Sequence, residues 1–259
     1  MKNKRLFFGA ILMASLMLTS CGGSRSVSNY PGLVSTQKKE ATSTGTNGTT
    51  GTTGTTGITG TTGTTGTTGT TGTTIKIGTQ TWSTKNLEVV KFRNGNPIPQ
   101  ARTLEEWEKA KDNKQPAWCY YDNDPANGTQ YGKLYNWFAV NDPRGLAPAG
   151  YHVPTDAEWT KLTVFLGGEN EAGEKIKSTS GWNENGNGTN RSGFVGLPGG
   201  YRNVFDGTCY FLNNSAVWWS ATDINTTTSW YRSLDYDGGA IYREPDDMGC
   251  GLSVRCIRD

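Results

Sequence analysis

Histidine is almost absent from this chain, because His152 is the only one among 259 residues. Zinc and iron centres commonly take several of their ligands from histidine. A single histidine cannot build such a centre, and the spacing favours no Ser-His-Asp or Cys-His arrangement. We therefore expect His152 to be a hydrogen-bonded structural residue, and we expect no cofactor, no metal ion and no enzymatic activity.

The chain also lacks a clear excess of charge of one sign. Its formal net charge is +2, from 25 basic and 23 acidic side chains. Without Lys2, Lys4 and Arg5, which lie in the N-terminal segment discussed next, 22 basic side chains would face 23 acidic ones. Nucleic-acid-binding domains normally carry a marked basic excess. We expect no nucleic-acid partner.

The apolar run at residues 6–18 is too short to cross a bilayer, which takes about 20 residues. It follows a basic start and ends at Leu18-Thr19-Ser20-Cys21, an order typical of a secretory signal. The four closing residues resemble the bacterial lipobox, in which the cysteine receives a diacylglycerol after cleavage. We expect a signal peptide at residues 1–20 and lipidation of Cys21; an ordinary secretory signal with an incidental cysteine is the alternative.

The residue after this cysteine is Gly22. Inner-membrane retention signals of enteric bacteria carry Asp at this position. The sequence therefore favours an exported protein that its N-terminal lipid holds on the outer membrane, facing the cell exterior.

Proline is missing from the low-complexity segment at residues 48–74, which consists of nine Gly-X-Thr-like triplets. Collagen needs imino acids between its glycines, and Gly/Thr repeats cannot bury a core. We expect residues 21–74 to be the lipidated cysteine followed by a disordered linker. A flexible coil of roughly fifty residues has an end-to-end distance on the order of 40 Å.

The aromatic residues are concentrated in the remainder, since all nine tryptophans and ten of the eleven tyrosines follow residue 75. We expect one domain at residues 75–259. Thr155 and Glu158 form a capping-box pattern that starts a helix ending at Gly167-Gly168. The apolar face of this helix recurs at helical spacing and places Trp159 in the core: Trp159, Leu162, Phe165 and Leu166.

Two further helices are expected at residues 103–111 and 131–140. Strands are expected at residues 75–77, 117–121, 193–197, 217–222, 229–234, 240–243 and 252–257. Helices first and strands afterwards predict an α+β domain. The long segments at residues 182–192 and 199–215 are expected to be irregular loops, where binding sites commonly lie.

Several segments resemble, in order, the Fibrobacter succinogenes major paralogous domain: IGTQTW from Ile75, AWCYYDNDP from Ala117, YGKLYNW from Tyr131, GYHVPTDAEW from Gly150, GFVGLPGGYR from Gly193 and GLSVRCIRD at the C-terminus. The resemblance covers essentially all of residues 75–259. That family consists largely of secreted or surface proteins without an assigned activity. It is similar to the formylglycine-generating enzymes, so the resemblance implies a C-type-lectin-like domain with few short helices, short twisted antiparallel strands and long loops.

The resemblance also indicates which residues an enzyme on this fold would need. Formylglycine-generating enzymes bind copper through a cysteine pair before the terminal strand, and the corresponding residues 230–243 contain no cysteine. Related sulfoxide synthases use several histidines. An enzyme with a non-standard site is therefore the second alternative, after a structural surface or fimbrial component.

Two segments have some features of a calcium site. Glu244-Pro245-Asp246 resembles the sugar-binding triplet of C-type lectins, but no Trp-Asn-Asp follows it. The loop Asp122-Asn123-Asp124, with Asn127-Gly128, departs by one residue from EF-hand spacing and lacks the closing Glu. We expect a turn with side-chain to backbone hydrogen bonds there, and bound calcium stays open as an alternative.

Four cysteines remain after Cys21, and cysteines of an exported protein are expected to pair. Three connectivities are open. We favour a disulfide between Cys209 and Cys250, which leaves Cys119 either paired with Cys256 or, like it, reduced in the core.

Trp218-Trp219 is the expected centre of a sugar-stacking surface. Side chains alternate across a strand, so one indole should face the core and the other the solvent; the alternative is that both are buried. The expected ligand-binding set is Trp218, Trp219, Tyr231, Asn213, Asn214 and Asp235. The sequence thus predicts a surface lipoprotein whose domain binds an extracellular partner, either a glycan, which is favoured, or a surface protein.

Overall fold

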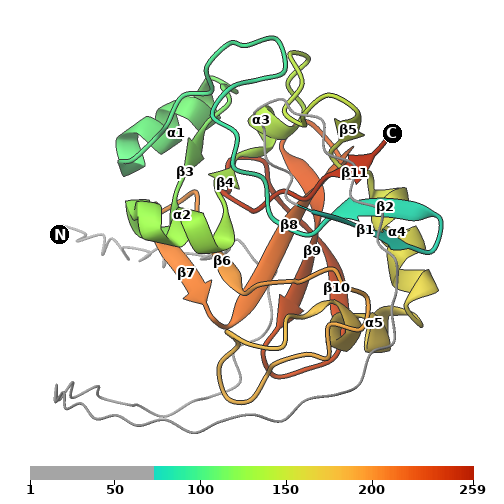
Figure 1. The fold of residues 1–259 in the computed structure, drawn as a ribbon. Helices are drawn as coiled ribbons and strands as arrows, with labels where there is room; N and C mark the ends of the chain where they lie inside the picture. The colour runs from blue at the N-terminus through green and yellow to red at the C-terminus, as the bar shows by residue number, and fades with distance from the viewer. Residues whose placement is uncertain (1–72) are drawn as a thin grey trace, which may run out of the picture. The chain divides into compact units, whose positions relative to one another are not determined.

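The computed structural model describes residues 73–259 (Figure 1). The expected signal peptide at residues 1–20, the expected lipidation site Cys21 and nearly all of the expected linker lie outside the described residues. The domain mixes short helices with curled sheets, so the α+β prediction is confirmed. Within residues 73–259 no helix has the length and apolar character needed to cross a membrane.

A five-stranded sheet forms the centre of the domain, in the order β10-β9-β8-β6-β7. Its strands are β6 (Gly199–Arg202), β7 (Cys209–Leu212), β8 (Ser215–Asp223), β9 (Thr228–Asp235) and β10 (Ile241–Asp247). All neighbours pair antiparallel except β6 and β8, which are parallel at Gly200 and Ala216. The short strand β7 is therefore one edge of the sheet.

A second sheet joins the two ends of the domain. It has the order β1-β2-β11-β5, with β1 (Thr74–Ile77), β2 (Gln80–Ser83), β5 (Tyr151–His152) and β11 (Ile257–Arg258). Ile257 pairs with both Trp82 and His152. The strands β3 (Trp118–Cys119) and β4 (Leu134–Tyr135) form a separate pair.

The helices are α1 (Leu104–Asp112), α2 (Pro125–Tyr131), α3 (Trp137–Val140), α4 (Asp156–Phe165) and α5 (Glu169–Ile176), with a 3-10 turn η1 (Tyr121–Asn123). The capping boxes at Thr103 and Thr155 are both present. The predicted helix at residues 131–140 is wrong: Gly132, at φ 80°, ends α2, and β4 precedes α3. Helix α5 was not predicted.

Further local predictions are wrong. Residues 193–197 form no strand, and of the strand predicted at residues 252–257 only Ile257 lies in one. Residues 199–215 are not an irregular loop, because they contain β6 and β7. The apolar face predicted for α4 is only partly buried: Trp159 and Leu162 lie in the core, whereas Phe165 is 62% exposed.

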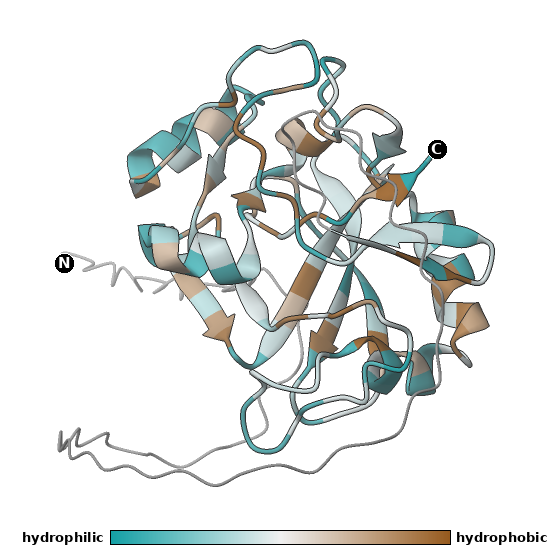
Figure 2. Ribbon diagram, viewed as in Figure 1, coloured by the Kyte–Doolittle hydropathy of each residue, from teal (hydrophilic) through white to brown (hydrophobic). Residues whose placement is uncertain are grey.

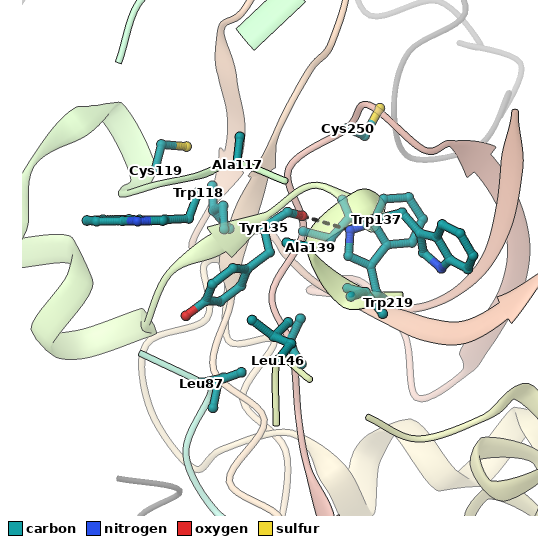
Figure 3. Packing of buried hydrophobic residues seen from close by; sticks show 14 of the residues in the cluster. Leu87, Ala117, Trp118, Cys119, Tyr135, Trp137, Ala139, Leu146, Trp219 and Cys250 are labelled. Carbon is teal, nitrogen blue, oxygen red and sulfur yellow. Dashed lines mark hydrogen bonds between the residues drawn. The ribbon is translucent and has the colours of Figure 1, made fainter. Parts of the chain in front are cut away.

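Strand β8 separates two hydrophobic clusters. Trp218 packs with Trp82, Trp159 and Phe194 in one cluster. Trp219 lies in the other, where its Nε1 donates to the backbone oxygen of Tyr135 at 2.8 Å (Figure 3). Both faces of β8 are therefore covered.

A buried guanidinium joins the C-terminal segment to the rest of the domain. Arg255 donates to Asn86 Oδ1 and to the backbone oxygens of Ser83, Phe194 and Val195. Burial lowers the pKa of Arg255 to about 9. Asn86 Oδ1 also accepts from Trp218 Nε1 at 2.8 Å. The hydrogen-bonding groups of Arg255 and Asn86 therefore stabilise the fold.

Candidate functional site

The predicted stacking residues do not face the solvent. Trp218, Trp219 and Tyr231 are completely buried. The alternation predicted for β8 exists, but each indole enters a core, because β8 lies between two packed layers. Neither tryptophan can stack on a ligand. The prediction of an outward Trp218 or Trp219 is wrong, and the alternative that both are buried is confirmed.

The polar residues predicted beside them hold the turns of the sheet. Asn213 Oδ1 accepts from the Tyr131 hydroxyl at 2.8 Å, and Asn214 Oδ1 accepts from Asn183 Nδ2 at 2.7 Å. Asp235 Oδ1 accepts from the Ser215 hydroxyl at 2.7 Å. All three carboxyl or amide groups therefore have partners within the domain.

Exposed aromatic side chains lie instead on the β6–β7 hairpin. Tyr210 is 36% exposed and Phe211 is 50% exposed. Their ring centroids are 6.2 Å apart, and both rings pack on the buried ring of Tyr201, at 6.0 and 5.9 Å. Figure 2 shows the hydrophobic colouring of β7 at the edge of the sheet. We call Tyr210 and Phe211 the β7 platform.

An unusual backbone places these two rings together. Phe211 has φ +64°, and Gly200, which stands opposite it in the β6–β7 register, has φ +61°. A bulky residue with positive φ is a genuine outlier. In a regular strand Tyr210 and Phe211 would project to opposite faces. The left-handed turn of the chain at Phe211 is what allows consecutive rings to share the surface of Tyr201.

Glycine is required at position 200. A Cβ there would lie 2.3 Å from the backbone oxygen of Tyr210 and 2.7 Å from the Tyr121 ring. This close approach fixes the hairpin against η1, so the backbone that carries the platform is well supported.

Polar groups border the platform. The Tyr210 hydroxyl donates to Asp206 Oδ2 at 2.6 Å, and this hydrogen bond raises the pKa of Tyr210. Asp206 Oδ1 accepts from the backbone N–H of Thr208. Phe205, 48% exposed, lies in the same hairpin with the Lys111 ammonium 4.9 Å above its ring. Acceptors and a cation thus adjoin flat apolar faces.

Beneath the hairpin the predicted disulfide is not formed. Cys209 is a free thiol whose Sγ accepts from the backbone N–H of Asp122 at 3.3 Å, so the predicted Cys209–Cys250 bridge is wrong. Cys119 and Cys256 are buried free thiols, which matches the alternative that both are reduced in the core.

His152 joins three parts of the chain. Its Nδ1 contacts Asp259 Oδ1 at 2.7 Å and its Nε2 contacts Glu158 Oε1 at 2.9 Å. Partial burial lowers the pKa of His152, but the hydrogen bonds to the two carboxylates outweigh burial and raise it. The prediction of a hydrogen-bonded imidazole is confirmed.

The two calcium-like segments are held by their own hydrogen bonds. Asp124 Oδ1 caps α2 at the N–H of Ala126, Asn123 Nδ2 donates to the Arg102 oxygen, and Asn127 Nδ2 donates to the Tyr121 oxygen. Glu244 Oε2 accepts from Tyr231. In the described part of the chain no group of three His, Cys, Asp or Glu side chains is arranged to hold a metal ion.

The comparison with family models agrees with the sequence motifs. The Fibrobacter succinogenes major domain matches residues 75–258, and the chain belongs to this family. No curated protein and no solved structure matches the chain. The function must therefore be argued from the geometry of the domain.

Proposed function

We propose that this chain is a cell-surface lipoprotein whose domain binds an extracellular carbohydrate at the β7 platform. As part of this proposal, the domain has a C-type-lectin-like arrangement and acts by binding, not by catalysis. The observation that carries the proposal is the pair of exposed, consecutive rings of Tyr210 and Phe211, held side by side by a positive φ at Phe211.

The platform has the chemistry that a sugar requires. A phenol or phenyl face matches the apolar face of a pyranose, while neighbouring polar groups bind its hydroxyls. Asp206 lies beside Tyr210 as an acceptor. Backbone strain of the kind seen at Phe211 concentrates at ligand-binding and catalytic sites, where surrounding structure supports it.

Weak single-site binding is compatible with this role. Many copies tethered to one surface would engage a polymeric glycan together, and a long flexible linker permits simultaneous contact. The expected lipid at Cys21 would provide the anchor. Metabolic labelling with a palmitate analogue should mark the wild-type chain and should not mark Cys21→Ala.

The test of the carbohydrate site is affinity electrophoresis of the purified chain in gels containing cell-surface polysaccharides. Tyr210→Ala and Phe211→Ala should each remove the retardation seen with wild type, while each variant still folds, as cooperative thermal unfolding would show. Phe165→Ala removes an exposed aromatic ring from α4, away from β7, and is the matched control. Retardation that survives in the Tyr210→Ala/Phe211→Ala double variant would disprove the site.

A further inference from the structure

Two cysteine thiols lie beside one buried guanidinium. Arg202 on β6 stands directly opposite Cys209 on β7. Side chains that are opposite each other on antiparallel strands project to the same face of the sheet. The Arg202 guanidinium also acts electrostatically on the thiol of Cys119, which is fully buried. Cys119 and Cys209, which are 90 residues apart in the sequence, therefore lie near the same guanidinium.

The turn η1, which follows Cys119 in the chain, also contacts Cys209. The backbone N–H of Asp122, three residues after Cys119, donates to Cys209 Sγ at 3.3 Å. Cys119 is fully buried in the cluster against which Cys209 packs. The Arg202 guanidinium keeps one unused donor, because its Nε is the single buried side-chain nitrogen or oxygen without a hydrogen-bond partner within residues 73–259.

The other free thiol has different surroundings. The backbone N–H of Cys256 donates to Ser83 Oγ where the inner strands β2 and β11 of the second sheet meet. The charged groups that act on its thiol are Arg255 and Arg93. Cys119, in contrast, interacts electrostatically with Cys209 itself. Of the three free thiols in the described domain, Cys119 and Cys209 are therefore the two that the geometry favours as a pair.

We propose that Cys119 and Cys209 form a disulfide that fastens the edge strand β7 to β3. The two thiols lose two protons and two electrons, one S–S bond forms, and a disulfide-bearing oxidant of the cell envelope is reduced to two thiols. This inference depends on the proposed export in one respect, because the oxidant is found in the cell envelope. It does not depend on carbohydrate binding.

The timing of the reaction follows from burial. Desolvation raises the pKa of Cys119 to about 12 and that of Cys209 to about 11, so the folded dithiol holds little thiolate, the form that attacks a disulfide. Oxidation therefore takes place during folding or when β7 opens. Once formed, the bond resists reductants until the domain is denatured.

The experiment folds the denatured, reduced full chain in oxidised glutathione, with a parallel sample in reduced glutathione. Free thiols are then blocked with N-ethylmaleimide, and peptides are mapped without reduction. The proposal predicts a Cys119–Cys209 cross-linked peptide and a blocked Cys256 in the oxidised sample, and blocked Cys119 and Cys209 in the reduced one. The oxidised chain should also have the higher urea midpoint.

Two variants make the result decisive. Cys209→Ser should leave Cys119 blocked, whereas Cys256→Ser should keep the cross-link. Blocked Cys119 and Cys209 after oxidative folding, or either one bridged to another cysteine, would overturn the proposal. Loss of the cross-link in the chain isolated from the cell envelope, with thiols trapped at lysis, would also count against it, even where the purified protein forms it.

Discussion

Trp218 and Trp219 are neighbours in the sequence and lie in different hydrophobic clusters. The alternation of a strand could be predicted from the sequence, but the layer that covers each face could not. Coverage depends on α4 and β2 on one side and on β4 and α3 on the other, which are distant in the chain. The same limit explains why Phe165, correctly spaced for the core, lies in the solvent.

Removal of either β8 indole should therefore destabilise the fold. We expect Trp218→Ala and Trp219→Ala each to lower the free energy of unfolding by about 3–5 kcal/mol. Phe165→Ala, on the surface, should change it by about 0.5 kcal/mol or less. Urea denaturation followed by circular dichroism measures all three. A wild-type midpoint in either tryptophan variant would contradict the two-cluster core.

Protonation of His152 should stabilise the domain. The pKa of the folded-state imidazole is raised above the unfolded value of about 6.5. The stabilisation is fully present below the unfolded pKa and is lost as pH rises through the folded pKa. Burial would raise the pKa of Glu158, but hydrogen bonds from Thr155 and His152 lower it, so this partner stays charged in mildly acidic solution.

The measurement is the urea midpoint of wild type and His152→Gln as a function of pH. The advantage of wild type should be largest near pH 6 and should shrink as the pH rises. Because the imidazole is partly exposed, solvent screening limits the size of this stability advantage. An advantage that grows with pH would mean that the neutral ring is the stabilising form.

At the scale of elements, the two helices with capping boxes could be predicted, because four consecutive residues mark where each helix begins. The β6–β7 hairpin could not. Its connecting residues 203–208, NVFDGT, show no alternation of apolar and polar side chains, and the positive φ at Gly200 and Phe211 interrupts the extended backbone on either side of them. The candidate site was missed for the same reason, although aromatic residues 201, 205, 210 and 211 marked the segment.

The strain at Phe211 makes a prediction of its own. Glycine adopts positive φ freely, whereas a residue with a Cβ pays about 1–2 kcal/mol there. We expect Phe211→Gly to be more stable than Phe211→Ala by about 1 kcal/mol in urea denaturation, while both lose glycan binding. Equal stability of the two variants would show that the left-handed backbone is not strained.

At the scale of the whole molecule, the second sheet joins the start of the domain to its end, because Trp82 on β2 pairs with Ile75 on β1 and with Ile257 on β11. Family membership and the α+β class were predictable from motifs distributed over residues 75–258. The position of the binding surface was not, since it depends on which aromatic residues remain uncovered once both faces of β8 are packed. The exposed aromatic edge at β7 is the surface at which we propose that a ligand binds.

The central claim is that the β7 platform binds carbohydrate, and amide chemical-shift mapping of the labelled chain tests it most directly. The chain is titrated with oligosaccharides prepared from polysaccharides that retard it in gels. The account predicts that the largest shifts fall on residues 205–212 and that the amides of Trp218 and Trp219 shift less. Shifts centred on another surface, or no shifts at any concentration, would contradict it.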